Sequence, residues 1–340
     1  GAVPSVSYAA CQKVPPSMDE MSLAGGLVGE PVQLVKCQTV DLEVPATSEV
    51  VFEGIIPTSY LEEEGPFGES MGVIDPRTLS PVLELTCVTH RKDPVWVSII
   101  SQVTPSESSK IKAMGMPTLI HRYLQNKGFT SVLEVSLTEA LVNLRPYVVL
   151  RMKKQNRQEP WEAMHAVLDY GDRVGKFVVT VDEDVNPADP LAVIWAITHR
   201  SQPHKDTEIV RNRPFGATPI GMVVNHPTSD YDSEESSLLI DATRKADFPP
   251  LSLPKKEYME QARAIWEELG LPELTPQEPW HGYPMGVWPE ELAEEAELAV
   301  AGEYGRLEEK LKGTRVAVGE GDTLKSVRAQ WGKTHAGRAE

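Results

Sequence analysis

Short apolar runs separated by turn-forming residues dominate the first hundred positions. Runs of this length, alternating or continuous, predict β-strands, and the glycine, proline and serine residues between them predict turns. The expected strands are 32–35, 40–44, 49–55, 82–88 and 95–100. Several short strands at this spacing favour a small β-barrel or sandwich.

From about residue 105 the pattern changes to an alternation of helices and strands. The expected helices are 108–115, 117–127, 161–168 and 190–198, and the expected strands are 132–137, 147–152 and 176–181. The run 176–181 is strongly apolar and β-branched, which is typical of a buried central strand. This alternation predicts a layered α/β or α+β domain.

The last third of the chain is expected to be helical after a loop. Residues 228–253 are rich in Ser, Asp and Pro, which predicts a loop. Apolar residues then fall on one helical face over 258–269, and a second helical stretch, 292–311, is interrupted by Gly302 and Gly305. The final twenty-odd residues are polar and are expected to be mobile.

Composition and charge narrow the class of protein. The chain has 340 residues, 41% of them hydrophobic, and a net charge of −17. This balance indicates a globular protein and argues against nucleic acid or an anionic membrane as a partner. No apolar run approaches the ~20 residues that span a bilayer, and no secretory signal is visible.

The cysteines and the first residue add two expectations. Cys11, Cys37 and Cys87 form no CxxC pair, so neither a disulfide framework nor a zinc site is predicted and a cytoplasmic location is expected. The chain begins with Gly1 rather than Met. We therefore expect either a processed start or a piece of a longer protein.

An acidic segment, 62–69, is the first candidate for chemistry. Gly65, Pro66 and Gly68 interrupt a regular strand and allow a bend that brings Glu64 and Glu69 to one pocket. Two close, desolvated carboxylates have pKa values pushed apart, so that one can act as a general acid. The alternative is a solvated acidic loop, which composition alone favours.

Two further segments have a functional and a structural interpretation. Thr104 or Ser106 is expected to cap a helix that starts near Pro105; a helix start can bind an anion, but an ordinary capped helix is favoured.

The acidic segment 182–189 suggests a metal site, but its spacing is not that of an EF-hand, and a turn with helix-capping acids is favoured.

Other catalytic motifs are not found in the sequence. None of the eight histidines falls at HxH or HExxH spacing, which leaves a zinc hydrolase poorly supported. No Gly-x-Ser-x-Gly elbow and no P-loop is present.

Three segments, in order, resemble the UbiD family of prenylated-FMN-dependent decarboxylases. They are 29–46, with Leu-Val-Lys-Cys-Gln-Thr-Val-Asp-Leu; 64–69, Glu-Gly-Pro-Phe-Gly-Glu; and 181–200, with Asp-Glu-Asp-Val, Trp-Ala-Ile and Thr-His-Arg. The resemblance covers roughly residues 5–250. It implies an α+β chain: the C-terminal part of a flavin-reductase-like split β-barrel (1–104) that binds the cofactor, a mixed α/β oligomerisation domain (105–250), and C-terminal helices with a tail (251–340).

The resemblance implies a carboxy-lyase. The reaction is the reversible, non-oxidative decarboxylation of an aromatic or α,β-unsaturated carboxylic acid through a covalent adduct with prenylated FMN. By position in the motif, Glu69 is the proton donor and Glu64 pairs with a catalytic arginine. The segment 282–288 is similar to hydroxybenzoate-type members, so that substrate class is favoured.

The family also binds its flavin phosphate through Mn²⁺ (or Mg²⁺) beside K⁺. An ungapped count from the Leu-Val-Lys-Cys strand assigns the shared glutamate ligand of metal and cofactor to Glu20. Ala10 and Gln12 fall near the backbone positions that bind potassium. Tyr170 occupies the position of a phosphate-binding lysine, with Lys176 nearby, and Phe215 falls where the family lines its substrate pocket.

The chain departs from the family in lacking the long N-terminal region that holds the catalytic arginine and the remaining metal ligands. No arginine precedes Arg77. The implied partner is therefore the N-terminal half of the enzyme, in the same or a separate chain. The apolar helix faces suggest a homo-oligomer or, equally, packing within the chain. Two other hypotheses are a non-catalytic scaffold or binding subunit and an ordinary FMN-binding split-barrel protein.

Overall fold

The computed structural model describes the chain with several gaps. The residues it does not describe are 13, 15–17, 69–71, 76, 101–102, 104, 138–146, 172–173, 215–234, 247–251, 253, 275–289, 313–314 and 336–340. The chain divides into two compact units, one of residues 1–246 with 253–284 and the other of 247–252 with 285–340. No helix within the described ranges is both long and apolar enough to cross a membrane.

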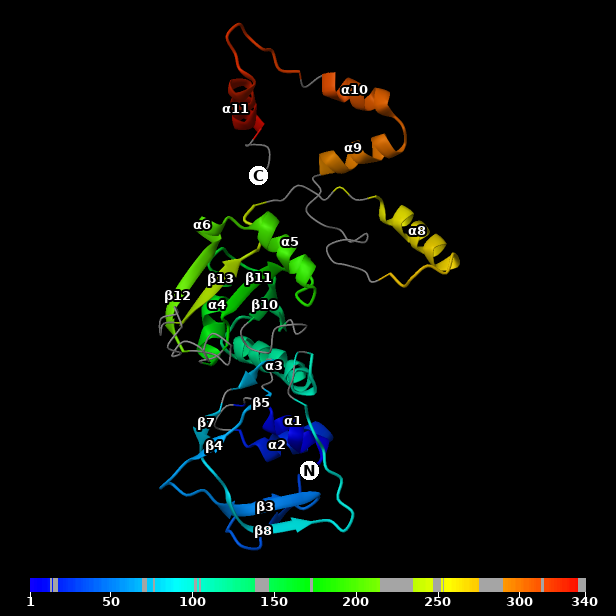
Figure 1. The fold of residues 1–340 in the computed structure, drawn as a ribbon. Coiled ribbons are helices and arrows are strands. Elements are labelled where there is room, and N and C mark those ends of the chain that lie inside the picture. The colour runs from blue at the N-terminus through cyan, green and yellow to red at the C-terminus, as the bar shows by residue number, and fades with distance from the viewer. Residues whose placement is uncertain are drawn as a thin grey trace. The chain divides into compact units, whose positions relative to one another are not determined.

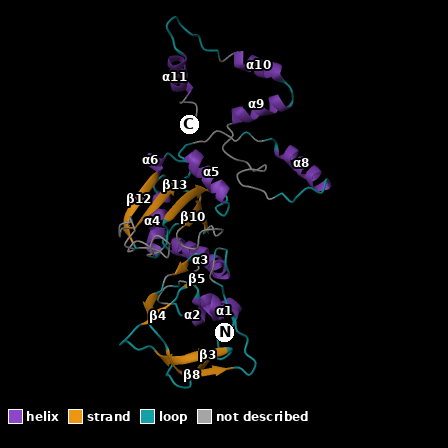
Figure 2. Ribbon diagram, viewed as in Figure 1, coloured by secondary structure: helices purple, strands orange, loops and turns teal. Residues whose placement is uncertain are grey.

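Residues 1–100 form two short helices and a set of antiparallel strand pairs (Figures 1 and 2). The helices α1 (Pro4–Ala10) and α2 (Glu20–Val28) pack on each other through Val6, Ala9 and Ala24. The strands are β1 (Leu34–Lys36), β2 (Glu43–Pro45), β3 (Val50–Ile55), β4 (Glu62–Glu64), β5 (Phe67–Gly68), β6 (Ile74–Asp75), β7 (Thr78–Ser80) and β8 (Glu84–His90). They pair as β1–β2, β3–β8, β4–β7 and β5–β6.

The split barrel expected for this part is not seen as a closed barrel. Each pair is a separate two-stranded sheet among the residues that the structure describes. The predicted strands near 32, 40, 49 and 82 have counterparts in β1, β2, β3 and β8. The strand predicted at 95–100 is wrong: these residues have no regular secondary structure and pair with no strand among the described residues.

Residues 107–241 build a five-stranded mixed sheet with helices on both faces. The strand order is β12–β13–β11–β10–β9, with β10, β11 and β13 parallel and both edge strands antiparallel to their neighbours. The strands are β9 (Val132–Ser136), β10 (Tyr147–Met152), β11 (Phe177–Asp182), β12 (Thr207–Arg213) and β13 (Glu235–Asp241). The helices are α3 (Glu107–Asn126), α4 (Glu159–Tyr170), α5 (Pro190–Arg200) and the short α6 (Pro203–Asp206).

Two hydrophobic cores lie on the two faces of this sheet. Because successive side chains of a strand point to opposite faces, Val148 and Leu150 of β10 pack against α3 and α4, whereas Val149 packs against α5. The α3–α4 side also holds Met116, Ile120, Leu124, Met164, Val167 and Leu239, all essentially inaccessible. This confirms the layered α/β arrangement predicted from the alternation of elements.

Two predictions for this region need correction. The two helices expected at 108–115 and 117–127 are one helix, α3, which continues through Pro117 because burial of Met116 and Ile120 on either side offsets the lost backbone hydrogen bond. The loop expected at 228–253 contains β13, which lies between β11 and β12. Its Ser237 and Asp241 are buried, so the polar composition suggested a loop wrongly.

The helices after the sheet are α8 (Lys256–Glu268), α9 (Glu290–Val300), α10 (Tyr304–Lys312) and α11 (Leu324–His335). The interruption predicted near Gly302 separates α9 from α10, which are joined by an ion pair between Lys310 and Glu295 at 3.1 Å. Within the tail expected to be mobile, residues 324–335 form α11.

Candidate active site

The start of α2 places the predicted metal ligand, Glu20, at the first helical position. Asp19 is the N-cap, and its Oδ2 accepts hydrogen bonds from the backbone N and the Oγ of Ser22, both at 3.0 Å. These bonds hold the pKa of Asp19 below its usual value. Glu20 follows in the first turn, where a carboxylate interacts favourably with the helix dipole. Its side chain is exposed and has no bonded partner within the described residues, which leaves it available for a ligand.

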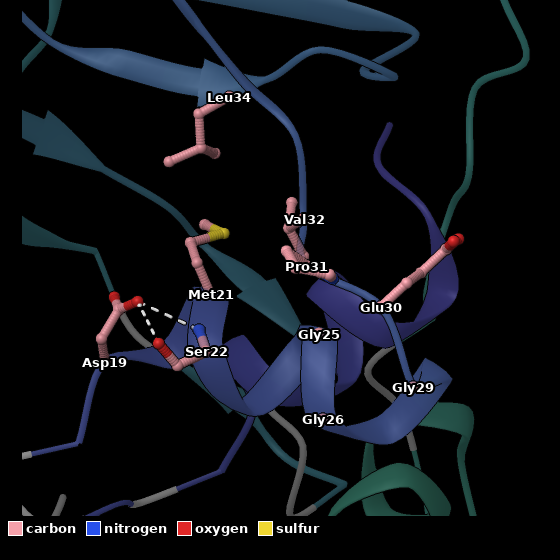
Figure 3. A pocket seen from close by; sticks show the side chains of 10 residues that line it. All are labelled: Asp19, Met21, Ser22, Gly25, Gly26, Gly29, Glu30, Pro31, Val32 and Leu34. Atoms are coloured by element: carbon pink, nitrogen blue, oxygen red, sulfur yellow. Dashed lines mark hydrogen bonds between the residues drawn. The ribbon is translucent and has the colours of Figure 1, made fainter.

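A pocket lies between α2 and the segment that follows it. Gly29 ends α2 with a left-handed backbone (φ 81°), and Gly25 allows the chain to fold back, since a Cβ there would lie 2.9 Å from the Glu30 carbonyl oxygen. The pocket has a volume of about 530 Å³. Figure 3 shows the Met21 side chain rising from the helix toward Leu34, and the Asp19 side chain folded onto Ser22. The pocket is therefore mostly apolar, and it contains the Asp19 carboxylate, which is held in place by its hydrogen bonds to Ser22.

The predicted potassium-binding positions lie at the end of α1. Ala10 is the last residue of the helix and is exposed. Gln12 is buried; its Nε2 donates to the Ile111 carbonyl at 3.4 Å, and its Oε1 has no hydrogen-bond partner in the described structure. Gly115 of α3 makes room for this amide, since a Cβ there would lie 2.3 Å from Gln12 Oε1. The buried amide oxygen is thus a free acceptor, the kind of hard oxygen that alkali and divalent cations prefer.

The Glu-Gly-Pro-Phe-Gly-Glu segment lies on an irregular antiparallel hairpin. Glu64 pairs with Thr78 at the end of β4–β7, and Phe67 pairs with Asp75 in β5–β6. The cis peptide Gly65–Pro66 lies between the two ladders, at the position where the sequence predicted a bend. Glu64 is exposed and no bonded partner is found for it in the described part of the chain. Glu69 lies outside the described residues, so its approach to Glu64 stays a prediction.

The neighbouring arginine, Arg77, does not contact Glu64. Its Nη1 donates to Glu63 Oε2 at 3.1 Å across the hairpin. Glu63 and Glu64 are adjacent on a strand and point to opposite faces. Arg77 is therefore engaged on the face away from Glu64.

A carboxylate that sequence reasoning missed organises the turn between β1 and β2. Glu53, on β3, is almost inaccessible and accepts hydrogen bonds from the backbone N of Gln38 (2.8 Å), the backbone N of Thr39 (2.6 Å) and Thr39 Oγ1 (2.8 Å). The bond from Gln38 is the main reason that the pKa of Glu53 lies below its usual value, and burial opposes it. The sequence did hold a sign of this role, because Glu53 is a single acidic residue within an apolar predicted strand.

Two further residues predicted to lie near the cofactor phosphate, Tyr170 and Lys176, belong to the α/β sheet domain. Tyr170 ends α4, is partly buried and meets Tyr123 edge-to-face, with ring centroids 5.2 Å apart. Lys176 forms an ion pair with Glu235 at 2.7 Å. Phe215 lies outside the described residues. Tyr170 is therefore packed in the helix layer, against Tyr123 of α3.

The acidic segment after β11 forms a buried ion-pair network. Arg200 donates from both terminal nitrogens to Asp184, at 2.8 and 2.7 Å, and from Nη1 to Asp182 at 2.9 Å. Asp182 also accepts from the Arg244 backbone N at 2.7 Å. Burial opposes ionisation of both carboxylates, and it raises the pKa of Asp182. At Asp184 burial is the largest single effect, but the hydrogen bonds and charge of Arg200, together with the charge of Arg244, outweigh it and lower the pKa. Loss of one partner of such a pair costs about 3–5 kcal/mol.

The metal interpretation of this acidic segment is not supported. Asp189 caps α5 by accepting from the Leu191 backbone N at 2.9 Å, as the capping interpretation predicts, whereas Asp182 and Asp184 bind an arginine rather than cap a helix. Across the part of the chain that the structure describes, no group of three His, Cys, Asp or Glu side chains could hold a metal ion. Ser106 caps α3, as predicted, in a capping box with Ser109.

Two family models match the chain in succession. A 3-octaprenyl-4-hydroxybenzoate carboxy-lyase Rift-related domain (UbiD) matches residues 1–103, and the C-terminal domain of the same carboxy-lyase (UbiD_C) matches residues 113–242. Together they match more than half of the chain.

Individual relatives agree with these models. An uncharacterized protein, sll0936, from Synechocystis is 31% identical over 296 residues, covering 81% of this chain and 54% of the relative. The UbiD-class enzyme HmfF from Pelotomaculum thermopropionicum, solved with FMN, is 30% identical with a TM-score of 0.62, and the match covers 76% of this chain and 57% of HmfF. An evolved dimeric form of HmfF with prFMN is 30% identical with a TM-score of 0.60, and the match covers 75% of this chain and 53% of that one.

A third relative is the vanillic acid decarboxylase of Sedimentibacter hydroxybenzoicus. In its closed form it is 27% identical with a TM-score of 0.66, covering 78% of this chain and 56% of that one. The chain therefore spans just over half the length of each of these relatives.

Proposed function

This chain belongs to the UbiD family, and from that premise we propose that it forms part of a prenylated-FMN-dependent carboxy-lyase. The proposed reaction is the reversible, non-oxidative decarboxylation of an aromatic acid, with the hydroxybenzoate type favoured over other unsaturated acids. The observation that carries the proposal is the succession of both family models along the chain, with the Glu-Gly-Pro-Phe-Gly-Glu segment inside the first of them. The similarity to a vanillic acid decarboxylase supports the substrate class.

The proposed chemistry of the protein is proton transfer and charge pairing. Glu69 delivers the proton that replaces the departing CO₂, and Glu64 pairs with an arginine that orients the substrate carboxylate. Glu64 is exposed, and none of the described residues pairs with it, while Arg77 is engaged by Glu63. These features support an arginine that comes from polypeptide outside this sequence.

The cofactor fits the described residues in part. Prenylated FMN, when bound, supplies the electron sink that decarboxylation requires. The pocket beside α2, about 530 Å³, lies in the size range of cofactor sites. None of the described residues pairs with the Glu20 carboxylate, which is therefore available to Mn²⁺ or Mg²⁺. The amide oxygen of Gln12, two residues after Ala10, is unpaired in the same part of the structure and marks a position suited to K⁺. Tyr170 near the cofactor phosphate and Phe215 in the substrate pocket remain proposals from sequence position.

The assembly proposed around this chain is larger than the chain itself. Residues 1–104 supply part of a split β-barrel, residues 105–250 an oligomerisation domain, and residues 251–340 the C-terminal helices. The N-terminal half of the enzyme, in the same or a separate chain, supplies the remaining ligands. The coverage of just over half of each relative supports this division. A homo-oligomer in the cytoplasm is the proposed final form.

Two alternatives from other classes are a non-catalytic scaffold subunit and a split-barrel protein that binds ordinary FMN. The sequence retains both Glu64 and Glu69, which a scaffold does not need. We therefore favour the enzyme.

Substitution of the motif carboxylates tests the proposed roles. In the assembled, flavin-loaded enzyme we expect Glu69→Gln to slow CO₂ release about 10²–10⁴-fold, the range for loss of a general acid. Glu64→Gln should also slow it strongly. The matched control is Glu62→Gln, an exposed acid two residues earlier on β4, which should change the rate less than about twofold, as for a surface change. Normal turnover of Glu69→Gln would contradict the assignment.

A further inference from the structure

Helix α3 has a notch at Gly115, and two side chains from another segment occupy it. A Cβ at this position would lie 2.3 Å from Gln12 Oε1, 2.5 Å from Gln12 Cδ and 2.6 Å from the Tyr8 hydroxyl. Gly115 is buried inside the helix, where glycine lowers helix stability relative to alanine. The absence of a side chain at this position is therefore explained by the two side chains that it admits.

Tyr8 and Gln12 approach the Gly115 notch from the end of α1. They are four positions apart, the spacing at which helical side chains lie side by side. The Gln12 backbone N donates to the Ala9 carbonyl at 3.0 Å, so the chain still turns up to this residue. The Gln12 side chain is buried, and its Nε2 donates to the Ile111 carbonyl of α3 at 3.4 Å. The end of α1 is therefore held to α3 by shape and by a hydrogen bond.

Another face of α1 packs on α2, the helix that carries the proposed metal ligand. Val6 and Ala9 of α1 and Ala24 of α2 are buried together in a small core between the two helices. Glu20 is the first residue of α2, and Asp19 caps it. α1 is therefore the element that connects α3 to the helix on which Glu20 lies.

We propose that Gly115 is a positioning residue. Its notch receives Tyr8 and Gln12, fixes the end of α1 on α3 and, through the contact of α1 with α2, sets the place of Glu20. This inference rests on the proposed function in one respect, because the role of Glu20 as a metal ligand belongs to that function. A side chain at residue 115 displaces the ends of two flexible side chains, so it releases α1 without disturbing the backbone of α3.

Hydrogen exchange in the chain alone tests the contact at the notch. Gly115→Ala should speed exchange of the amides of residues 11–12 and 23–25 by about 5- to 30-fold, the change expected when local opening no longer breaks a hydrogen bond and its packing. The α/β sheet should unfold at the same or a higher denaturant concentration, because alanine is the better helix former. Unchanged exchange at residues 23–25 would overturn the proposal.

The matched control is Gly305→Ala. Gly305 is a helical glycine of α10, and a Cβ there would meet no atom within 4 Å. This variant gains the same methyl group and the same helix propensity, but it displaces nothing. It should leave exchange at residues 11–12 and 23–25 unaffected.

A double-mutant cycle separates release of α1 from a general effect of the methyl group on α3. The combined change Tyr8→Phe and Gln12→Ala removes the atoms that a Cβ at residue 115 would displace. Gly115→Ala should therefore cause no further acceleration at residues 23–25 in that background. Accelerations that add would show that Gly115 does not act through these two side chains, and would overturn the proposal.

Metal binding by the assembled, flavin-loaded enzyme tests the link to Glu20. Mn²⁺ affinity, titrated by electron paramagnetic resonance, should be about 10-fold weaker in Gly115→Ala, the lower end of the range for residues that orient a metal ligand. CO₂ release at saturating Mn²⁺ should be nearly unchanged. Unaltered Mn²⁺ affinity in this variant would overturn the positioning role. If the unsubstituted enzyme binds no Mn²⁺, the proposed function fails, and the exchange experiments still decide whether Gly115 fixes α1.

Discussion

The structural role of each acidic side chain in this chain depends on its burial and on its hydrogen-bond partners. Glu53 is buried and tied to the backbone of residues 38 and 39, so it shapes the turn after β1. Asp19 caps α2, and Asp184 is held by Arg200. Glu20 and Glu64, in contrast, are exposed and have no partner among the described residues. Unengaged carboxylates at these two positions are what a ligand-binding role requires.

The Glu53 contact should make the order of the β1–β2 turn depend on pH. Because hydrogen bonds from the backbone hold the folded pKa of Glu53 below the usual glutamate value of 4.5, its contribution to stability is complete above that value and is lost as pH falls through the folded pKa. We expect the amide protection factors of residues 38–39 to fall as pH drops below about 4.5. Glu53→Gln should have low protection at all pH values, measured by hydrogen exchange corrected for intrinsic rates.

The control for this prediction is Glu43→Gln, an exposed acid on the adjacent strand β2. Its pH profile should match that of the unaltered chain. A Glu53→Gln profile parallel to that of the unaltered chain would show that the carboxylate does not hold the turn.

Residue-scale features were predictable from the sequence where the partner lies within a few positions. Ser106 was predicted as a helix cap because its partner, Ser109, is three residues away. The contact of both terminal Arg200 nitrogens with Asp184 was not predicted, because sixteen residues separate the two and an arginine in a helix has many possible partners.

At the scale of elements, periodicity predicted those strands and helices whose burial follows their hydrophobicity. The central strands β10 and β11 and helices α4 and α5 were found in this way. β13 was missed because Glu235, Ser237 and Asp241 are buried with their polar groups paired, Asp241 with Thr243 and Lys245, and Glu235 with Lys176. Residues 95–100 failed in the opposite sense: they have the composition of a strand but pair with no strand among the described residues.

The place of β13 in the sheet can be checked by truncating its buried side chain. Leu239 is fully buried between β11 and the α3–α4 layer, so Leu239→Ala should lower the free energy of unfolding by about 2–5 kcal/mol. Ile209→Ala, on the neighbouring edge strand and 62% exposed, is the matched control and should cost about 0.5 kcal/mol or less. Equal costs in chemical denaturation would contradict a central β13.

At the scale of the whole molecule, the family resemblance in three short segments was enough to identify the family, and the family models confirm it. The α/β sheet forms a complete core, whereas residues 1–103 bury few hydrophobic side chains. No closed barrel is seen among the described residues, so barrel closure and the full set of active-site residues stay proposals.

The most direct test of the account measures cofactor-dependent CO₂ release by the assembled enzyme. The chain is combined with the complementary fragment of the Synechocystis relative, loaded with either prenylated FMN or ordinary FMN, and given carboxyl-labelled hydroxybenzoate. We predict labelled CO₂ with prenylated FMN only, and its loss in Glu69→Gln. Equal release with ordinary FMN, or no release from hydroxybenzoates or other unsaturated acids by the complex loaded with prenylated FMN, would contradict the proposed function.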